Sequence, residues 1–157
     1  MTESEASRTG AVASAASTFL PRKLRVSLLS NVYLLAGRYG EALARAEQAL
    51  ELAHRYHEKG SAAWALYMLA ASEGASGSSL KRGGPLQVYL EALQAAETLG
   101  MRPLSAHCHL GLGHHLALSA AGRAREHLKR ARELYSEMDM QSWLKMTQSA
   151  LKELEAR

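Results

Sequence analysis

Apolar residues recur along this chain at helical spacing rather than in strict alternation. From about residue 24 they fall three and four positions apart, in segments that end at glycine, proline or Gly/Ser-rich stretches. This spacing places the apolar side chains on one face of a helix. The pattern predicts seven helices, over about 24–36, 40–57, 62–73, 85–100, 103–118, 123–138 and 140–156.

Residues with known positional preferences mark the ends of these segments. Gly60 follows the second segment as a helix stop, and Ser61 and Asp139 stand where an N-cap is expected. Pro85 suits a first helical turn, where its missing N–H does little harm. Gly and Ser dominate residues 74–84, which predicts a loop between the third and fourth helices.

Composition supports an all-helical domain. Ala and Leu are abundant, whereas Val occurs four times and Ile is absent, and β-branched residues carry much of the preference for strands. The 47% apolar and 22% charged content is that of a globular domain. We therefore expect one helical domain over 21–157. The Ala-, Ser- and Thr-rich residues 1–20 are predicted to be a disordered N-terminal tail.

The predicted helices form three pairs that repeat a set of small and large residues. The first pair carries Leu29, Ser30, Tyr33, Gly37, Tyr39, Ala42, Ala46 and Ala49. The third pair carries Leu112, Gly113, Leu116, Ala124, Leu128 and Ala131, and the middle pair keeps Leu69, Ala70, Tyr89 and Ala92. Small residues let two antiparallel helices approach closely, and large ones fill the spaces between them. The equivalent alanines lie 43 and then 39 residues apart.

These spacings resemble the tetratricopeptide repeat (TPR), in a variant longer than the roughly 34 residues of the standard repeat. The resemblance implies an all-α fold, a right-handed α-solenoid of three TPR-like helix hairpins plus a C-terminal capping helix. The first helix of each hairpin would then line a concave groove that binds a protein or peptide partner. The groove positions are Leu24, Ser27 and Asn31, then Trp64, Tyr67 and Ala71, then His107, Leu110 and His114. Alternatively, Trp64 and Tyr67 only pack against a neighbouring helix.

A finer resemblance rests on four stretches of the second half of the chain, 95–104, 106–113, 124–128 and 137–144. They are similar to the C-terminal TPR region of large bacterial signalling proteins. Those proteins join a class III nucleotide cyclase or a LuxR-type DNA-binding domain to an ATPase domain and a TPR array. The cyclase and ATPase domains are absent from this sequence, so the resemblance implies the fold and a regulatory partner but no enzymatic activity.

Two groups of residues invite a metal interpretation, and helix geometry argues against both. His107, Cys108 and His109 point in different directions on a helix, and His107 lies roughly 10 Å along the axis from His114. Glu51 and His54 have the Glu-x-x-His spacing of carboxylate-bridged metal sites, but such a site needs a second copy on another helix. We therefore predict no metal, no cofactor, no catalytic residue and no enzymatic function.

The function expected from the sequence is a protein–protein interaction module of a bacterial signalling or regulatory process. The single cysteine cannot form an internal disulfide, which favours a reducing, cytoplasmic location. No apolar run is long enough for a membrane span. A net charge of +4 spread along the chain makes nucleic-acid binding the less favoured alternative. A nucleic-acid-associated regulator subunit, a remnant TPR sensor part of a cyclase/ATPase regulator, and a homodimer remain alternatives.

Overall fold

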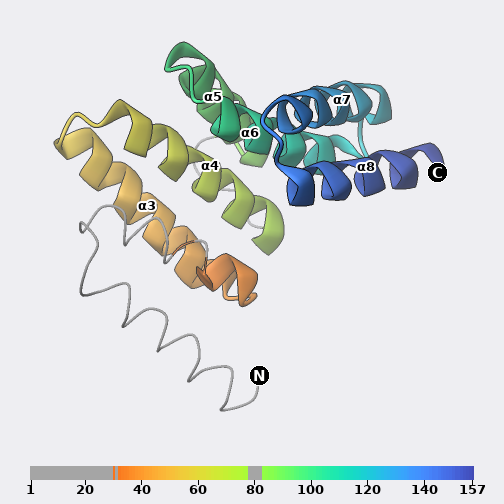
Figure 1. Ribbon diagram of the computed structural model, residues 1–157. Helices are drawn as coiled ribbons and strands as arrows, with labels where there is room; N and C mark the ends of the chain where they lie inside the picture. The colour runs from red at the N-terminus through yellow and green to blue at the C-terminus, as the bar shows by residue number, and fades with distance from the viewer. Residues whose placement is uncertain (1–29, 31, 78–82) are drawn as a thin grey trace. The chain divides into compact units, whose positions relative to one another are not determined.

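All regular structure in the described part of the chain is α-helical. The computed structural model describes residue 30 and residues 32–77 and 83–157 (Figure 1). The predicted tail over 1–20 lies outside these residues and stays a prediction. Labelled as in Figure 1, the helices are α3 (Tyr39–Arg55), α4 (Lys59–Ser76), α5 (Pro85–Thr98), α6 (Arg102–Leu116), α7 (Ala121–Glu137) and α8 (Gln141–Glu155).

The chain divides into two compact units, Met1–Ser78 and Ser79–Arg157. The boundary lies within the Gly/Ser-rich stretch that separates the third and fourth predicted helices. The second predicted hairpin therefore has its two helices, α4 and α5, in different units. The prediction of an all-α fold is confirmed for the described residues.

In the first unit, α3 packs against α4 along small residues (Figure 1). Ala42 and Ala46 of α3 and Ala63 of α4 are fully buried. Ser30, in the helical turn before α3, is also fully buried, and its hydroxyl donates a hydrogen bond to the carbonyl oxygen of Ala42 at 2.8 Å. This contact joins two of the small positions of the predicted first hairpin.

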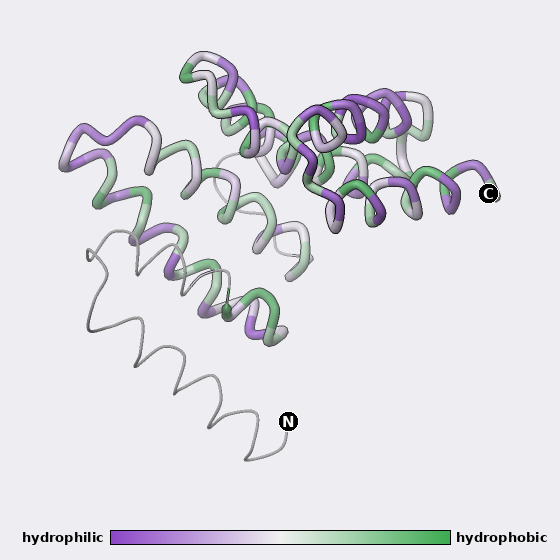
Figure 2. The backbone as a smooth tube through the Cα atoms, viewed as in Figure 1, coloured by the Kyte–Doolittle hydropathy of each residue, from purple (hydrophilic) through white to green (hydrophobic). Residues whose placement is uncertain are grey.

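In the second unit, each of the helices α5 to α8 packs against the next one along the chain. The α7 trace alternates between hydrophilic and hydrophobic residues (Figure 2), as an amphipathic helix with one buried face requires. Its buried face meets α6 and α8 in one apolar core. Members of this core include Ala106, Leu110, Leu116, Ala124, Leu128, Ala131, Leu134, Tyr135, Leu151 and Leu154.

Two glycines of α6 set how closely its neighbours approach. A Cβ atom added to Gly111 would lie 2.5 Å from the ring of Tyr89 in α5, and one added to Gly113 would lie 2.6 Å from Leu128 in α7. Both distances are far below ordinary carbon–carbon contact. The absence of a side chain at each position is therefore what admits the large residue from the neighbouring helix.

One turn geometry recurs where α3, α5 and α7 end. Gly100 after α5 has a φ of 66°, and His57 and Asp139 take the same left-handed conformation at φ 56° and 54°. In each case the next N–H donates to the carbonyl five residues earlier, at 2.8–2.9 Å, which closes a Schellman motif. Gly37, before α3, has the same geometry, with a φ of 71°.

The geometry of this turn shows that three predicted helix ends are wrong. The second helix ends before His57, so Gly60 is not a stop and lies with Ser61 in the first turn of α4. Ser61 caps nothing there, and its hydroxyl donates to the Glu58 carboxylate at 2.9 Å. Asp139 is the left-handed residue of the turn and not an N-cap, a position that Met140 occupies. The predictions failed because His and Asp here accept a conformation for which glycine is the usual signal.

The predicted loop also starts too early in the sequence. Residues 74–76, predicted as loop from their Gly and Ser content, continue α4 as far as Ser76, and Gly77 ends the helix at a φ of 64°. The fifth predicted helix is shorter than expected, because α6 ends at Leu116 instead of residue 118. No helix of the described residues combines the length and apolar character that a membrane crossing requires.

We predict that Gly113→Ala destabilises the second unit. Alanine favours a helix over glycine by about 1 kcal/mol, but the new methyl group would overlap Leu128. The expected net result is a free energy of unfolding lower by about 1–2 kcal/mol. Urea denaturation followed by Trp143 fluorescence, in a Trp64→Phe background that removes the other tryptophan, measures it. Gly122→Ala is the control, because that site has open space. Equal stability of the two variants would contradict the prediction.

Candidate functional site

Three of the predicted groove residues form a stripe along α4. Trp64, Tyr67 and Ala71 are spaced by three and four residues, which places them on one face of the helix. The Trp64 and Tyr67 rings lie edge to face, with centroids 5.9 Å apart and an interplanar angle of 85°. All three residues are half-buried, so each is partly accessible in the folded chain. We call this set the α4 stripe.

The predicted groove residues of α6 are in different surroundings from one another. His107 is buried, and its Nδ1 forms a 2.8 Å hydrogen bond with the Tyr135 hydroxyl. Its ring also lies edge-on to Trp143 of α8, with centroids 4.5 Å apart. Leu110 belongs to the apolar core and is 5% exposed. His107 and Leu110 thus face the interior of the second unit, and both stabilise its packing.

His114 is the exposed member of the α6 set. Partial burial lowers the pKa of its imidazole, and the nearby Glu153 carboxylate of α8 opposes this effect. Leu24, Ser27 and Asn31 lie outside the described residues. A single groove through all three predicted sets therefore stays a prediction, and the α4 stripe and His114 are described within their own units.

A pair of histidines lies between α6 and α7. The Nδ1 atoms of His109 and His127 are 2.9 Å apart, and their ring centroids are 5.2 Å apart. Burial lowers the pKa of His109 to about 4, with the charges of His127 and Arg130 adding to the effect. Burial also lowers the pKa of His127. A neutral pair can share one N–H between the two nitrogens, which satisfies both.

The residues considered for a metal site are either packed in the core or paired with another side chain. Cys108 is fully buried, and burial raises the pKa of its thiol to about 12, which keeps it protonated and unreactive. Glu51 is exposed and forms a 2.8 Å ion pair with Arg55 instead of meeting His54. Among the described residues, no three His, Cys, Asp or Glu side chains are grouped so that they could hold a metal.

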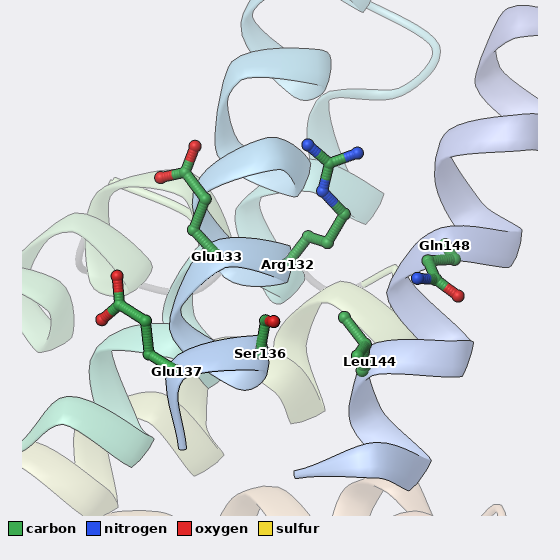
Figure 3. A pocket seen from close by; sticks show the side chains of 6 residues that line it. All are labelled: Arg132, Glu133, Ser136, Glu137, Leu144 and Gln148. Carbon is green, nitrogen blue, oxygen red and sulfur yellow. The ribbon is translucent and has the colours of Figure 1, made fainter. Parts of the chain in front are cut away.

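The structure adds a surface that the repeat pattern did not indicate, a groove between α7 and α8. Two hollows of about 510 and 430 Å³ lie along it and share Arg132 and Gln148. Figure 3 shows Arg132 and Ser136 of α7 on the side that faces Leu144 and Gln148 of α8. The lining residues are Lys129, Arg132, Glu133, Ser136, Glu137, Leu144, Gln148, Leu151, Lys152 and Glu155. We call this surface the α7–α8 groove.

A comparison with solved structures supports the repeat fold. A crystal structure of the apo form of RapI is similar to this chain, with a TM-score of 0.71 and 22% sequence identity. The match covers 96% of this chain and 55% of the RapI chain, so this chain spans about half the length of RapI. RapI is of helical-repeat type. The chain therefore has a helical-repeat fold.

Neither a protein-family model nor a curated protein matches the chain. The finer resemblance to the TPR region of cyclase-linked or LuxR-type regulators therefore stays a prediction.

We predict that acid weakens the fold through the buried histidines. Burial lowers the pKa of His107 and His109 to about 4, from an ordinary value of 6.5. Between these values the unfolded chain binds more protons than the folded chain, so the free energy of unfolding falls as the pH falls from 6.5 to 4. Each histidine is expected to contribute on the order of 1 kcal/mol.

Chemical denaturation at several pH values tests this, and the slope against pH is the quantity of interest. His109→Gln should flatten that slope, because it removes one titrating group. His115→Gln, which replaces an exposed histidine of the same helix, is the matched control. The same slope in wild type and His109→Gln would refute the assignment.

Proposed function

We propose that this chain is a protein-interaction module that binds a protein or peptide partner through the α4 stripe. The observation that carries the proposal is the half-buried, partly accessible, edge-to-face pair of Trp64 and Tyr67. Large aromatic side chains supply much of the binding energy of protein interfaces, and they lose little conformational entropy on binding. A spacing of three and four residues suits contact with an extended peptide or a second helix.

The chemistry of the titratable groups supports binding over catalysis. His107 is held between Tyr135 and Trp143, and His109 is paired with His127. Burial lowers the pKa of His107 and His109 and raises that of Cys108, which makes a general base or a nucleophile at these positions unfavourable. We therefore infer that the module has no enzymatic activity of its own.

The process and location are part of the same proposal. The resemblance of residues 95–144 to TPR regions of bacterial cyclase-linked and LuxR-type regulators supports a cytoplasmic signalling or regulatory role. The helical-repeat fold that the chain shares with RapI is consistent with this assignment. A partner supplied by such a regulatory system is therefore the expected ligand of the α4 stripe.

Affinity capture from the organism that encodes the chain tests the proposal. Tagged wild-type protein should enrich one or a few specific proteins, and Ala71→Arg should reduce their recovery about tenfold or more. The substitution places a charged side chain at the C-terminal end of the stripe, one helical turn from Tyr67, and leaves both aromatic rings in place. Trp64→Ala/Tyr67→Ala should have the same effect through loss of contact area.

The controls separate lost binding from lost folding. Tyr56→Ala removes a tyrosine of the same unit that is 63% exposed and lies outside the stripe, and it should capture as wild type does. Circular dichroism and thermal unfolding of each variant establish that it is folded. Equal recovery by wild type and a folded Ala71→Arg variant would show that the stripe is not the binding surface.

A further inference from the structure

We infer that the α7–α8 groove is a second docking site, for an amphipathic helix of a partner whose exposed flank is acidic. This inference rests on the proposed function as an interaction module, but it concerns a different surface. Unlike the α4 stripe, the α7–α8 groove combines an apolar floor with uncompensated positive charge. These two properties define the length, the pattern and the charge of its occupant.

The dimensions of the groove fit a short helix. Its lining runs over 129–137 in α7 and 144–155 in α8. At 1.5 Å per residue these segments extend about 12 Å and 16 Å, which is two to three helical turns. Because the two hollows share Arg132 and Gln148, they form one continuous trough along the helix pair. A rod-like ligand that lies along the helices makes use of both hollows at once.

The apolar floor has a helical spacing. Leu144 is half-buried, whereas Leu151 is a member of the apolar core that keeps 6% of its surface exposed, and both line the groove from α8. They are seven residues apart, roughly 10 Å along the axis. A docked helix would meet them with two apolar residues at positions i and i+7, the usual anchor spacing for a helix in a groove. The aliphatic parts of Gln148 and Arg132 border the trough between these anchors.

The charges of the groove are unevenly compensated. Glu133 pairs with Arg130 at 3.1 Å, and Glu137 pairs with Arg102 of α6. In Figure 3, Glu133 and Glu137 lie on the flank of α7 away from Leu144 and Gln148 of α8. The carboxylates near the Leu144 end are thus already neutralised by arginines of the same unit.

The opposite end of the groove is positive. Lys129, Arg132 and Lys152 line it, and within the described residues none of them takes part in an ion pair. Glu155 is the one carboxylate that lines this end, so three positive charges and one negative charge leave +2. A helix with Asp or Glu beside its second apolar anchor would face these cations. This asymmetry also fixes the direction in which the helix lies.

A selection from a library of helical peptides tests the inference without knowledge of the natural partner. The probe is a surface-displayed pool of single helices of about 18 residues with randomised faces, selected for binding to the full-length chain. The expected winners carry apolar residues seven positions apart and at least two acidic residues at one end. Their affinity for Lys129→Glu/Lys152→Glu should fall about tenfold or more, because the cations become anions.

The matched control is Lys59→Glu/Lys145→Glu, which makes the same change of net charge at two exposed lysines outside the groove lining. Its affinity for the selected helices should stay within about twofold of wild type. Leu144→Ala provides an independent readout, because it removes an apolar anchor without a change of charge. Circular dichroism establishes that the variants are folded.

Several outcomes would overturn the inference. They are the absence of any selected helix, winners that are neutral or basic, and equal binding to wild type and the groove variant. Winners that lose binding only with Ala71→Arg would support the α4 stripe and refute the groove. Sedimentation at several protein concentrations tests whether the groove is instead occupied by a second copy of the chain. Self-association of wild type that Lys129→Glu/Lys152→Glu abolishes would assign the groove to a second copy of the chain.

Discussion

The fold depends on close approach between helices at positions that carry little or no side chain. Gly111 and Gly113 of α6 receive the Tyr89 ring from one neighbour and Leu128 from the other. In the first unit, the contact of Ser30 with the carbonyl oxygen of Ala42 has the same character, because a small side chain bonds directly to the facing backbone. Since packed interiors tolerate little added volume, these few positions determine the spacing of their helix pairs.

Aromatic rings make a second kind of contact between the helices. In the second unit, His107, Tyr135 and Trp143 come from three successive helices, and their rings meet in one cluster in which His107 and Tyr135 are buried and Trp143 is half-buried. The cluster therefore links α6, α7 and α8 beyond their pairwise seams. Trp64 and Tyr67 also meet each other but are only half-buried on α4. His107 and Tyr135 thus stabilise the second unit from within, whereas Trp64 and Tyr67 of the first unit stay partly accessible.

The sequence predicts the helices and their small-residue seams well, because both depend on local spacing. Gly113 and Ala42 occupy repeat positions that are visible in the sequence, and both are buried at seams. Helix ends are harder to predict when His57 or Asp139 adopts the conformation expected of glycine. The core position of Leu110 and the α7–α8 groove depend on contacts between helices, which a repeat pattern does not specify. The prediction of site residues is correspondingly weaker than that of the fold.

The groove follows from the same packing physics that builds the repeat. In the second unit α6 and α7 each pack closely against two helices, whereas α8 packs closely against α7. Two adjacent helices leave between them the same kind of trough that a neighbouring helix fills inside the stack. Leu144 and Leu151 supply the apolar contacts of such a trough, but Lys129, Arg132 and Lys152 line it with charges that the core seams lack. A ligand here must therefore imitate a repeat helix in shape and differ from it in charge, and this difference gives the site its selectivity.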